Sequence, residues 1–92
     1  MSSQIAKAQV TIRNRLGLHA RPAMSFVEVA SEHDSTVKVR KNDQEVDGKS
    51  IMQMMLLAAT QGSVLEIIAE GNDAAAAIRA LCDLVERGFD ED

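Results

Sequence analysis

The chain of 92 residues is 46% hydrophobic, 2% aromatic and 26% charged, and it carries a formal net charge of −4 at pH 7. This length predicts a single domain over residues 1–92 with a small core, and the hydrophobic fraction excludes an intrinsically disordered chain. The acidic balance and the absence of Trp and Tyr argue against nucleic acid as a partner, because such binding needs cations for phosphates and aromatic rings for bases.

Apolar and polar residues alternate near the start of the chain, with a period of two that predicts a first strand with one buried face. The apolar positions are Ala6, Ala8, Val10 and Ile12. Residues 14–18 follow as a loop, in which Gly17 is free to adopt a backbone angle that other residues avoid.

A helix is predicted from about Ala20 to Ser31, because the apolar residues of this stretch recur at the spacing of one helical face. They are Ala23, Phe26, Val27 and Ala30. Pro22 fits the first turn of a helix, where no N–H bond is required, so it places the start of this helix near His19.

A β-hairpin is predicted for residues 36–47, where stretches of alternating polarity flank a turn. A second, short helix is expected over residues 51–60, since Ser50 and Gln53 match a capping box at its start. Gly62 is expected to cap the C-terminal end of that helix.

Residues 64–70 predict the most apolar strand, which we place in the centre of the sheet. A third helix follows, capped by Asn72 or Asp73 and ending near Gly88. The acidic tail, residues 90–92, is expected to fray. The element order β-α-β-β-α-β-α predicts an α+β domain, with a four-stranded antiparallel sheet and three helices on one face.

The segment Gly17-Leu18-His19-Ala20-Arg21-Pro22 holds the most specific chemistry of the chain. A helix start exposes backbone N–H groups without intrahelical partners and carries the positive end of the helix dipole, which suits a phosphoryl group. The imidazole of His19 is a nucleophile near neutral pH, so it could carry the phosphoryl group covalently. The segment therefore predicts a covalent phosphate carrier.

Two motifs in register extend this reading to nearly the whole chain. Residues 17–23, GLHARPA, resemble the active-site signature of HPr, the histidine-containing phosphocarrier of the bacterial phosphoenolpyruvate-dependent phosphotransferase system. Residues 48–52, GKSIM, resemble the regulatory-serine signature of the same family. The resemblance implies an open-faced β-sandwich whose histidine is phosphorylated by enzyme I and then donates to a histidine of an EIIA protein in sugar uptake.

By the same resemblance, His19 is the phosphorylated residue, through its Nδ1 atom, and Arg21 is the partner of the phosphate. We assign the backbone amides of Ala20 and Arg21 to the same phosphoryl oxygens. Ser50 matches the regulatory site of HPr kinase/phosphorylase, although its role as a helix cap also explains it fully.

The second helix offers the expected docking surface for partners. We expect its buried face to be formed by Met54, Leu57 and Ala58. The family geometry then places the exposed docking residues at Ile51, Met52 and Met55. Methionine is flexible and suits a surface that must fit several partners in turn.

Two other functions stay open. The first is a carrier of the NPr type, which serves a nitrogen-related regulatory relay: residues 88–92 resemble NPr endings, whereas the intact motif at residues 48–50 favours HPr. The second is a purely regulatory partner that acts through phospho-Ser50, which the presence of His19 disfavours. An independent enzyme is not expected, because the sequence has no nucleotide-binding loop, acid/base pair or metal cluster.

The remaining expectations concern compartment and assembly. The single cysteine, Cys82, excludes an internal disulfide and is typical of a reducing compartment. Residues 1–10 hold no apolar run that could serve as a signal peptide, and the longest apolar stretch is too short to span a membrane. We expect a monomeric cytoplasmic protein without a metal or other cofactor.

Overall fold

The computed structural model describes residues 4–91, and its elements follow the predicted order. They are β1 (Ile5–Thr11), α1 (Ala20–Ser31), β2 (Thr36–Lys41), β3 (Gln44–Asp47), α2 (Ile51–Leu56), β4 (Val64–Glu70), α3 (Ala74–Glu86) and a short 3₁₀ turn, η1 (Gly88–Asp90). The prediction of an α+β domain with the order β-α-β-β-α-β-α is confirmed.

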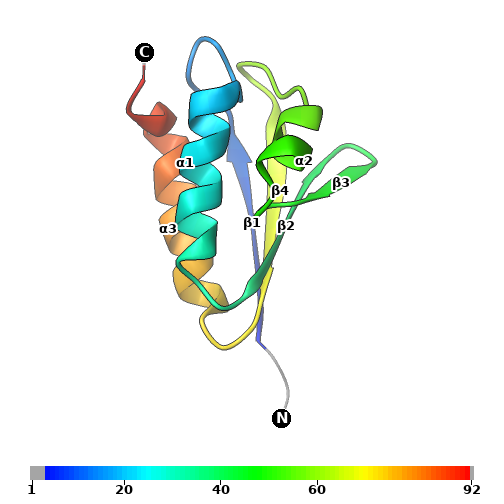
Figure 1. Cartoon of the computed structure of the whole chain (residues 1–92), viewed down its shortest axis with the longest axis vertical. Helices are drawn as coiled ribbons and strands as arrows, with labels where there is room; N and C mark the ends of the chain where they lie inside the picture. The colour runs from blue at the N-terminus through cyan, green and yellow to red at the C-terminus, as the bar shows by residue number, and fades with distance from the viewer. Residues whose placement is uncertain (1–3, 92) are drawn as a thin grey trace.

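The four strands form one antiparallel sheet in the order β1-β4-β2-β3, and the three helices cover one of its faces (Figure 1). The apolar strand β4 lies between β1 and β2, as its composition predicts. Its inward residues Leu65, Ile67 and Ala69 are buried, and register places Val10 of β1 opposite Leu65 and Val39 of β2 opposite Ile67. The resulting apolar face explains why all three helices gather on one side.

Helix α2 ends at Leu56, earlier than the predicted Thr60. The side-chain Nζ of Lys41 donates to the backbone carbonyls of Leu57 at 3.0 Å and Ala58 at 3.4 Å, so it satisfies carbonyls that a longer helix would use itself. Ala58 then turns out of the helix with a φ of 49°. The prediction that Ala58 is buried is therefore wrong, and the buried alanine is Ala59.

Gly62 does not cap α2, contrary to the sequence prediction. It lies in the turn before β4 with a φ of 91°, and its N–H donates to the carbonyl of Ile12 at 2.8 Å. Gly62 does mark a turn with a left-handed backbone, but this turn joins the start of β4 to the end of β1.

The loop before α1 is held against the segment that follows α2. The N–H of Leu18 donates to the carbonyl of Ala59 at 2.8 Å, and Leu18 is buried beneath the loop. Gly17 has a φ of 71°, and a Cβ at this position would lie 2.5 Å from the carbonyl oxygen of Ala59. Only glycine satisfies both conditions, so Gly17 fixes the approach of the chain to α1.

Asp73 stands at the N-cap of α3, as predicted, but its carboxylate does not cap the helix. It accepts from the backbone N–H groups of Asp34 and Ser35, both at 2.9 Å, and from the hydroxyl of Ser35. The Ser35 hydroxyl, followed by the Asp34 N–H, lowers the pKa of Asp73 to about 2. The carboxylate thus ties the turn after α1 to the start of α3.

This arrangement predicts that Asp73→Asn lowers the melting temperature at pH 7, because the amide loses the charged acceptor of three hydrogen bonds. The carboxyl has a folded pKa of about 2, below the ordinary 3.8, so its contribution is present above about pH 4 and lost as pH falls toward 2. The difference in melting temperature between parent and variant should therefore shrink between pH 4 and pH 2. Asp43→Asn in the exposed turn is the control, and a constant Asp73 difference across this range would contradict the assignment.

Candidate functional site

His19 is the N-cap residue of α1, in an extended conformation with φ −82° and ψ −169°. Its side chain does not cap the helix, which leaves the ring at the surface with 39% of the side chain exposed. Its carbonyl accepts the first helical bond, from the N–H of Ala23 at 3.0 Å. The amides of Ala20 and Arg21 therefore precede the helical ladder, and neither donates a hydrogen bond within residues 4–91.

The loop that presents His19 is held by a buried side chain, Asn14. Its Nδ2 donates to the carbonyl of Gly17 at 2.7 Å and to Oε1 of Glu91 at 3.2 Å. The loop is closed further by bonds from the N–H of Gly17 to the carbonyl of Asn14 and from the N–H of His19 to the carbonyl of Gly17. Asn14 thus joins the loop before α1 to the C-terminal tail. The two residues are 77 positions apart, so no local sequence pattern predicts this contact.

The acidic tail does not fray at Glu91, contrary to the sequence prediction. Three successive residues, Gly88, Phe89 and Asp90, have left-handed backbones with φ of 66°, 56° and 60°, and they turn the chain back toward α1. Phe89 is buried and anchors this turn. Oε1 of Glu91 then lies 3.0 Å from Nε2 of His19, and this hydrogen bond, more than any other contact, holds the pKa of the Glu91 carboxyl below its usual range. Asp92 lies outside the described residues.

The ring of His19 opens into a shallow depression of about 480 Å³. Its lining consists of Arg15, Leu16, His19, Ala20, Arg21 and Glu91. Arg21 is exposed and forms no ion pair with any residue between 4 and 91, so its guanidinium is available to an incoming anion. Two guanidinium groups and the start of a helix make this depression favourable for a phosphoryl group.

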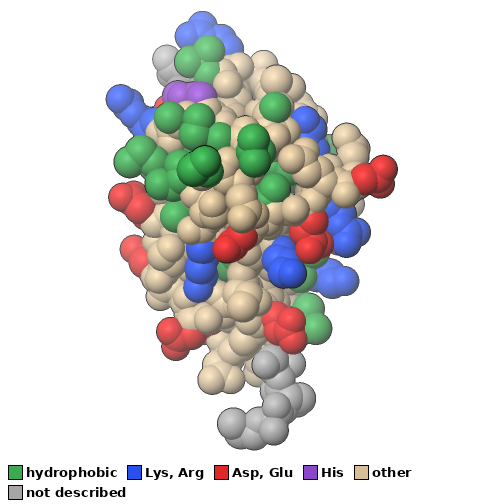
Figure 2. All heavy atoms as spheres, turned by 45° about the vertical axis from the view of Figure 1, so that its right-hand side comes forward, with side chains coloured by type: hydrophobic (Ala, Val, Ile, Leu, Met, Phe, Trp, Pro, Cys, Tyr) green, Lys and Arg blue, Asp and Glu red, His purple; other side chains and the backbone are tan. Residues whose placement is uncertain are grey.

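Large apolar side chains are exposed on α1, α2 and the loop before α1, and we call this surface the apolar rim. It comprises Leu16, Met24, Ile51, Met52, Met55 and Leu56, with exposures between 40% and 78%. Figure 2 shows hydrophobic side chains gathered on the upper part of the molecule, next to a histidine. The predicted exposure of Ile51, Met52 and Met55 is confirmed, whereas the sequence reasoning missed the other three residues.

For two of these three residues, Met24 and Leu16, the sequence pattern could have predicted their exposure. Met24 lies one position after the buried Ala23, outside the apolar stripe of α1. Leu16 is an apolar residue in the loop between β1 and α1. Apolar residues at positions that the helical or loop pattern assigns to solvent are candidates for contact with partners.

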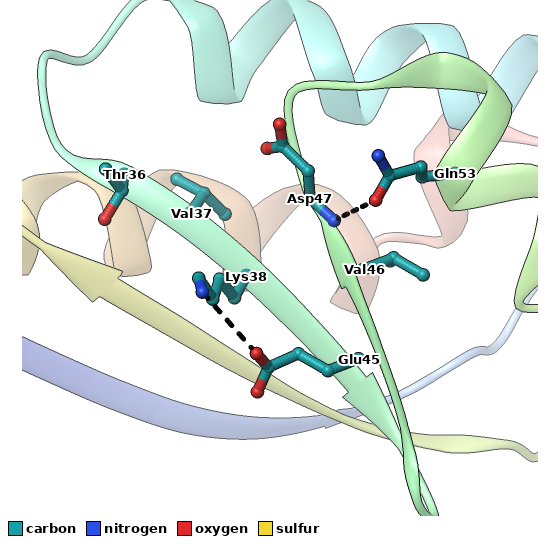
Figure 3. Close-up of a pocket in the computed structure, with 7 residues that line it drawn as sticks. All are labelled: Thr36, Val37, Lys38, Glu45, Val46, Asp47 and Gln53. Atoms are coloured by element: carbon teal, nitrogen blue, oxygen red, sulfur yellow. Dashed lines mark hydrogen bonds and ion pairs between the residues drawn. The ribbon is translucent and has the colours of Figure 1, made fainter.

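Ser50 is the N-cap of α2, and its Oγ accepts from the N–H of Gln53 at 3.2 Å. The second half of the expected capping box takes a different partner, because Oε1 of Gln53 accepts from the N–H of Asp47 at 2.9 Å (Figure 3). The start of α2 is therefore tied to β3 as well as to itself. Ser50 is half-buried beside the exposed Ile51 and Met52.

A second depression, of about 350 Å³, lies between the β2-β3 hairpin and the start of α2 (Figure 3). Several of its charged and polar groups interact with each other. Nζ of Lys38 forms an ion pair with Oε2 of Glu45 at 3.6 Å, and Oε1 of Gln53 accepts a hydrogen bond from the N–H of Asp47. It contains neither His19 nor Arg21, so it is not part of the site around α1.

No group of three His, Cys, Asp or Glu side chains within residues 4–91 could hold a metal ion. The Nδ1 of His33, the second histidine, lies 3.0 Å from the carbonyl of Val29, which engages that ring locally. In the same described part of the chain, every helix is too short or too polar to cross a membrane.

Comparisons with known proteins identify the family of this chain. The family described as "PTS HPr component phosphorylation site" matches residues 6–87. The phosphocarrier protein HPr of Neisseria meningitidis is 49% identical over 92% of this chain and 96% of its own length, and the phosphocarrier protein NPr of Proteus mirabilis is 44% identical over 91% and 94%. A crystal structure of HPr from Thermoanaerobacter tengcongensis superposes with a TM-score of 0.91 at 45% identity, over 95% of this chain and 98% of that one. The chain belongs to the HPr family of phosphocarrier proteins of the phosphotransferase system.

Proposed function

We propose that His19 accepts a phosphoryl group from phospho-enzyme I and passes it to a histidine of an EIIA protein in sugar uptake. The observation that carries this proposal is the placement of the imidazole of His19 beside two undonated amides, of Ala20 and Arg21, at the start of α1. Within residues 4–91, Nδ1 of His19 makes no hydrogen bond, so its lone pair is available to phosphorus.

The transfer requires little chemistry beyond positioning and charge. The Nδ1 lone pair forms a bond to phosphorus while the bond from phosphorus to the donor nitrogen breaks, and the donor keeps that electron pair. The amides of Ala20 and Arg21 and the guanidinium of Arg21 stabilise the negative charge of the phosphoryl oxygens during the transfer. The chain is thus a substrate and a phosphodonor of other enzymes rather than an enzyme itself.

The exposure of the site requires that partners exclude water from it. A phosphoryl group on a side chain that is 39% exposed is protected only while a partner covers the depression. The apolar rim, whose Leu16 also lines the depression, supplies this contact in the proposal, and Met52 is its most exposed member at 78%. We propose a cytoplasmic monomer as the working unit.

A carrier of the NPr type is the second candidate. It is favoured by the likeness to relatives of both names, at 49% identity for one HPr and 44% for one NPr. Both branches would use the same His19 chemistry, so they differ only in which enzyme I donates.

Phosphorylation of Ser50 by an HPr kinase/phosphorylase is a proposed layer of control. A phosphate on the N-cap residue is compatible with the helix, because negative charge is favourable at a helix start. The same charge lies directly beside Ile51 and Met52 of the apolar rim, where it opposes the burial of apolar surface by a partner. A role through phospho-Ser50 alone is the weaker alternative, since His19 and its surroundings would then serve no purpose.

The carrier function predicts that phosphoenolpyruvate and enzyme I place one acid-labile phosphate on the chain. His19→Ala should abolish this labelling, and His33→Ala, which changes the other histidine, should leave it intact. Incubation with enzyme I of the sugar type and of the nitrogen type, followed by a chase to EIIA proteins, identifies the branch by the faster donor. Absence of labelling by both donors would refute both carrier proposals.

The docking role of the rim predicts that Met52→Asp raises the KM of enzyme I for the carrier about tenfold, because a carboxylate must be desolvated at an apolar contact. Its free energy of unfolding should stay within about 0.5 kcal/mol of the parent, since the side chain is mostly exposed. Ala76→Asp, on the exposed side of α3, is the control with the same added charge. A parental KM for Met52→Asp would remove Met52 from the interface.

The regulatory role of Ser50 separates from its capping role in two variants. Ser50→Asp preserves an N-cap and adds charge, so it should slow transfer from enzyme I while leaving the melting temperature unchanged. Ser50→Ala removes the cap, so it should cost about 1 kcal/mol of stability and leave transfer normal. Parental transfer rates in Ser50→Asp would contradict control of docking by charge at this position.

A further inference from the structure

We infer that Glu91 is a positioning residue for the transfer at His19: its carboxylate keeps the ring proton on Nε2 and so leaves Nδ1 as the unprotonated nucleophile. This inference rests on the proposed function of His19, and it assigns a specific role to the C-terminal tail. From sequence alone, the acidic tail is expected to fray, and residues 88–92 bear only on the choice between the HPr and NPr branches.

The geometry of the contact determines which nitrogen carries the proton. Oε1 of Glu91 lies 3.0 Å from Nε2 of His19. An ionised carboxylate can only accept hydrogen bonds, so Nε2 must be the donor and must carry hydrogen. The low pKa of the Glu91 carboxyl, which results first from this hydrogen bond, agrees with an ionised group. Nδ1 of the neutral ring is then the nitrogen with the free lone pair.

The carboxylate is held in place from a second direction. Nδ2 of the buried Asn14 donates to the same Oε1 at 3.2 Å, while it also bonds to the carbonyl of Gly17. The Glu91 side chain is 19% exposed, half the exposure of the His19 side chain. An oxygen fixed by two donors and shielded from water orients the ring more narrowly than an exposed carboxylate would.

The backbone of the tail shows that this placement is maintained against a local cost. Phe89 and Asp90 are not glycines, yet both have left-handed backbones, with φ of 56° and 60°. The burial of Phe89 and the bond from Nε of Arg87 to Oδ1 of Asp90 at 3.1 Å hold this turn. Unfavourable backbone angles persist where the surrounding structure determines them, and they concentrate at functional sites.

When Nε2 of His19 carries the hydrogen, both transfer steps proceed without proton movement at the ring. When Nδ1 bonds to phosphorus, the hydrogen on Nε2 stays and the ring becomes a cation, which the carboxylate of Glu91 stabilises. When the phosphoryl group leaves for an acceptor nitrogen, the electron pair of the N–P bond returns to Nδ1 and the ring is neutral again. With hydrogen on Nδ1, the first step would need a base, and no residue between 4 and 91 is bonded to Nδ1.

The test compares Glu91→Gln with Asp90→Asn. Both remove one negative charge from the tail, but the amide of Asp90→Asn keeps an oxygen that can accept from Nε of Arg87, and Asp90 forms no hydrogen bond with His19. The amide of Gln can accept or donate, so it no longer enforces hydrogen on Nε2. Nitrogen-15 chemical shifts of the neutral His19 ring should show mainly the Nε2–H form in the parent and in Asp90→Asn, and a mixture of both forms in Glu91→Gln.

Transfer kinetics provide the functional readout. Glu91→Gln should slow single-turnover transfer from phospho-enzyme I at least tenfold with little change in KM, as expected for a residue that orients a reacting ring. Phosphoramidate, a small phosphoryl donor, should label Nδ1 of the parent and give both ring isomers in Glu91→Gln, as distinguished by phosphorus-31 NMR. Neither the small donor nor the ring spectra require enzyme I, so they report on Glu91 even if the proposed carrier function fails.

The inference is overturned if Glu91→Gln keeps the Nε2–H form and transfers within twofold of Asp90→Asn. It is also overturned if the slower transfer results only from a raised KM, because the tail would then act in docking. Failure of the parent to accept phosphate from enzyme I, with the ring form still dependent on Glu91, would refute the carrier function alone.

Discussion

The first amides of α1 must stay without protein partners if they are to hold a phosphoryl group, and much of the fold serves that requirement. His19 has an extended backbone and turns its ring away from the helix, so it caps nothing. Pro22 contributes no N–H at all. The approach to the helix is fixed by Gly17, whose left-handed backbone and close contact with Ala59 leave no other route. The unsatisfied donors of a helix start are thus retained at the surface and aimed at the site.

Around this constraint, the molecule separates the residues of its core from its exposed apolar surface. The core is built from side chains of the sheet and of α1 and α3, while α2 buries only Met54 among its six residues. Helix α2 is held instead by its ends, through Ser50 and Gln53 at the start and Lys41 at the finish. A helix stabilised by its termini can expose an apolar surface to partners without that surface being needed for folding.

Features that depend on residues close together in the sequence could be predicted, whereas features that depend on contacts between distant positions could not. The bounds of α1 and the central place of β4 follow from local periodicity, and the hypothesis about His19 could be made because its whole chemical signature is contiguous in the sequence. The end of α2 was not predicted because Lys41, which donates to the carbonyls of Leu57 and Ala58 just after the helix, lies in another element. Asp73 was recognised as a cap by type, yet its partners Asp34 and Ser35 lie some 38 positions away. Glu91 was missed for the same reason, since its hydrogen bond to His19 spans 72 positions.

The left-handed turn at Phe89 also determines how firmly the tail is attached to the domain. The tail beyond α3 is attached by one buried ring, a few hydrogen bonds and the contact with His19, so its opening releases far less buried surface than unfolding of the sheet. We therefore expect local opening to govern amide exchange at Glu91, whose N–H donates to the carbonyl of Gly88, and global unfolding to govern exchange in β4. Opening of the tail would break the hydrogen bond between Glu91 and His19 while the sheet and the rest of the domain stay folded.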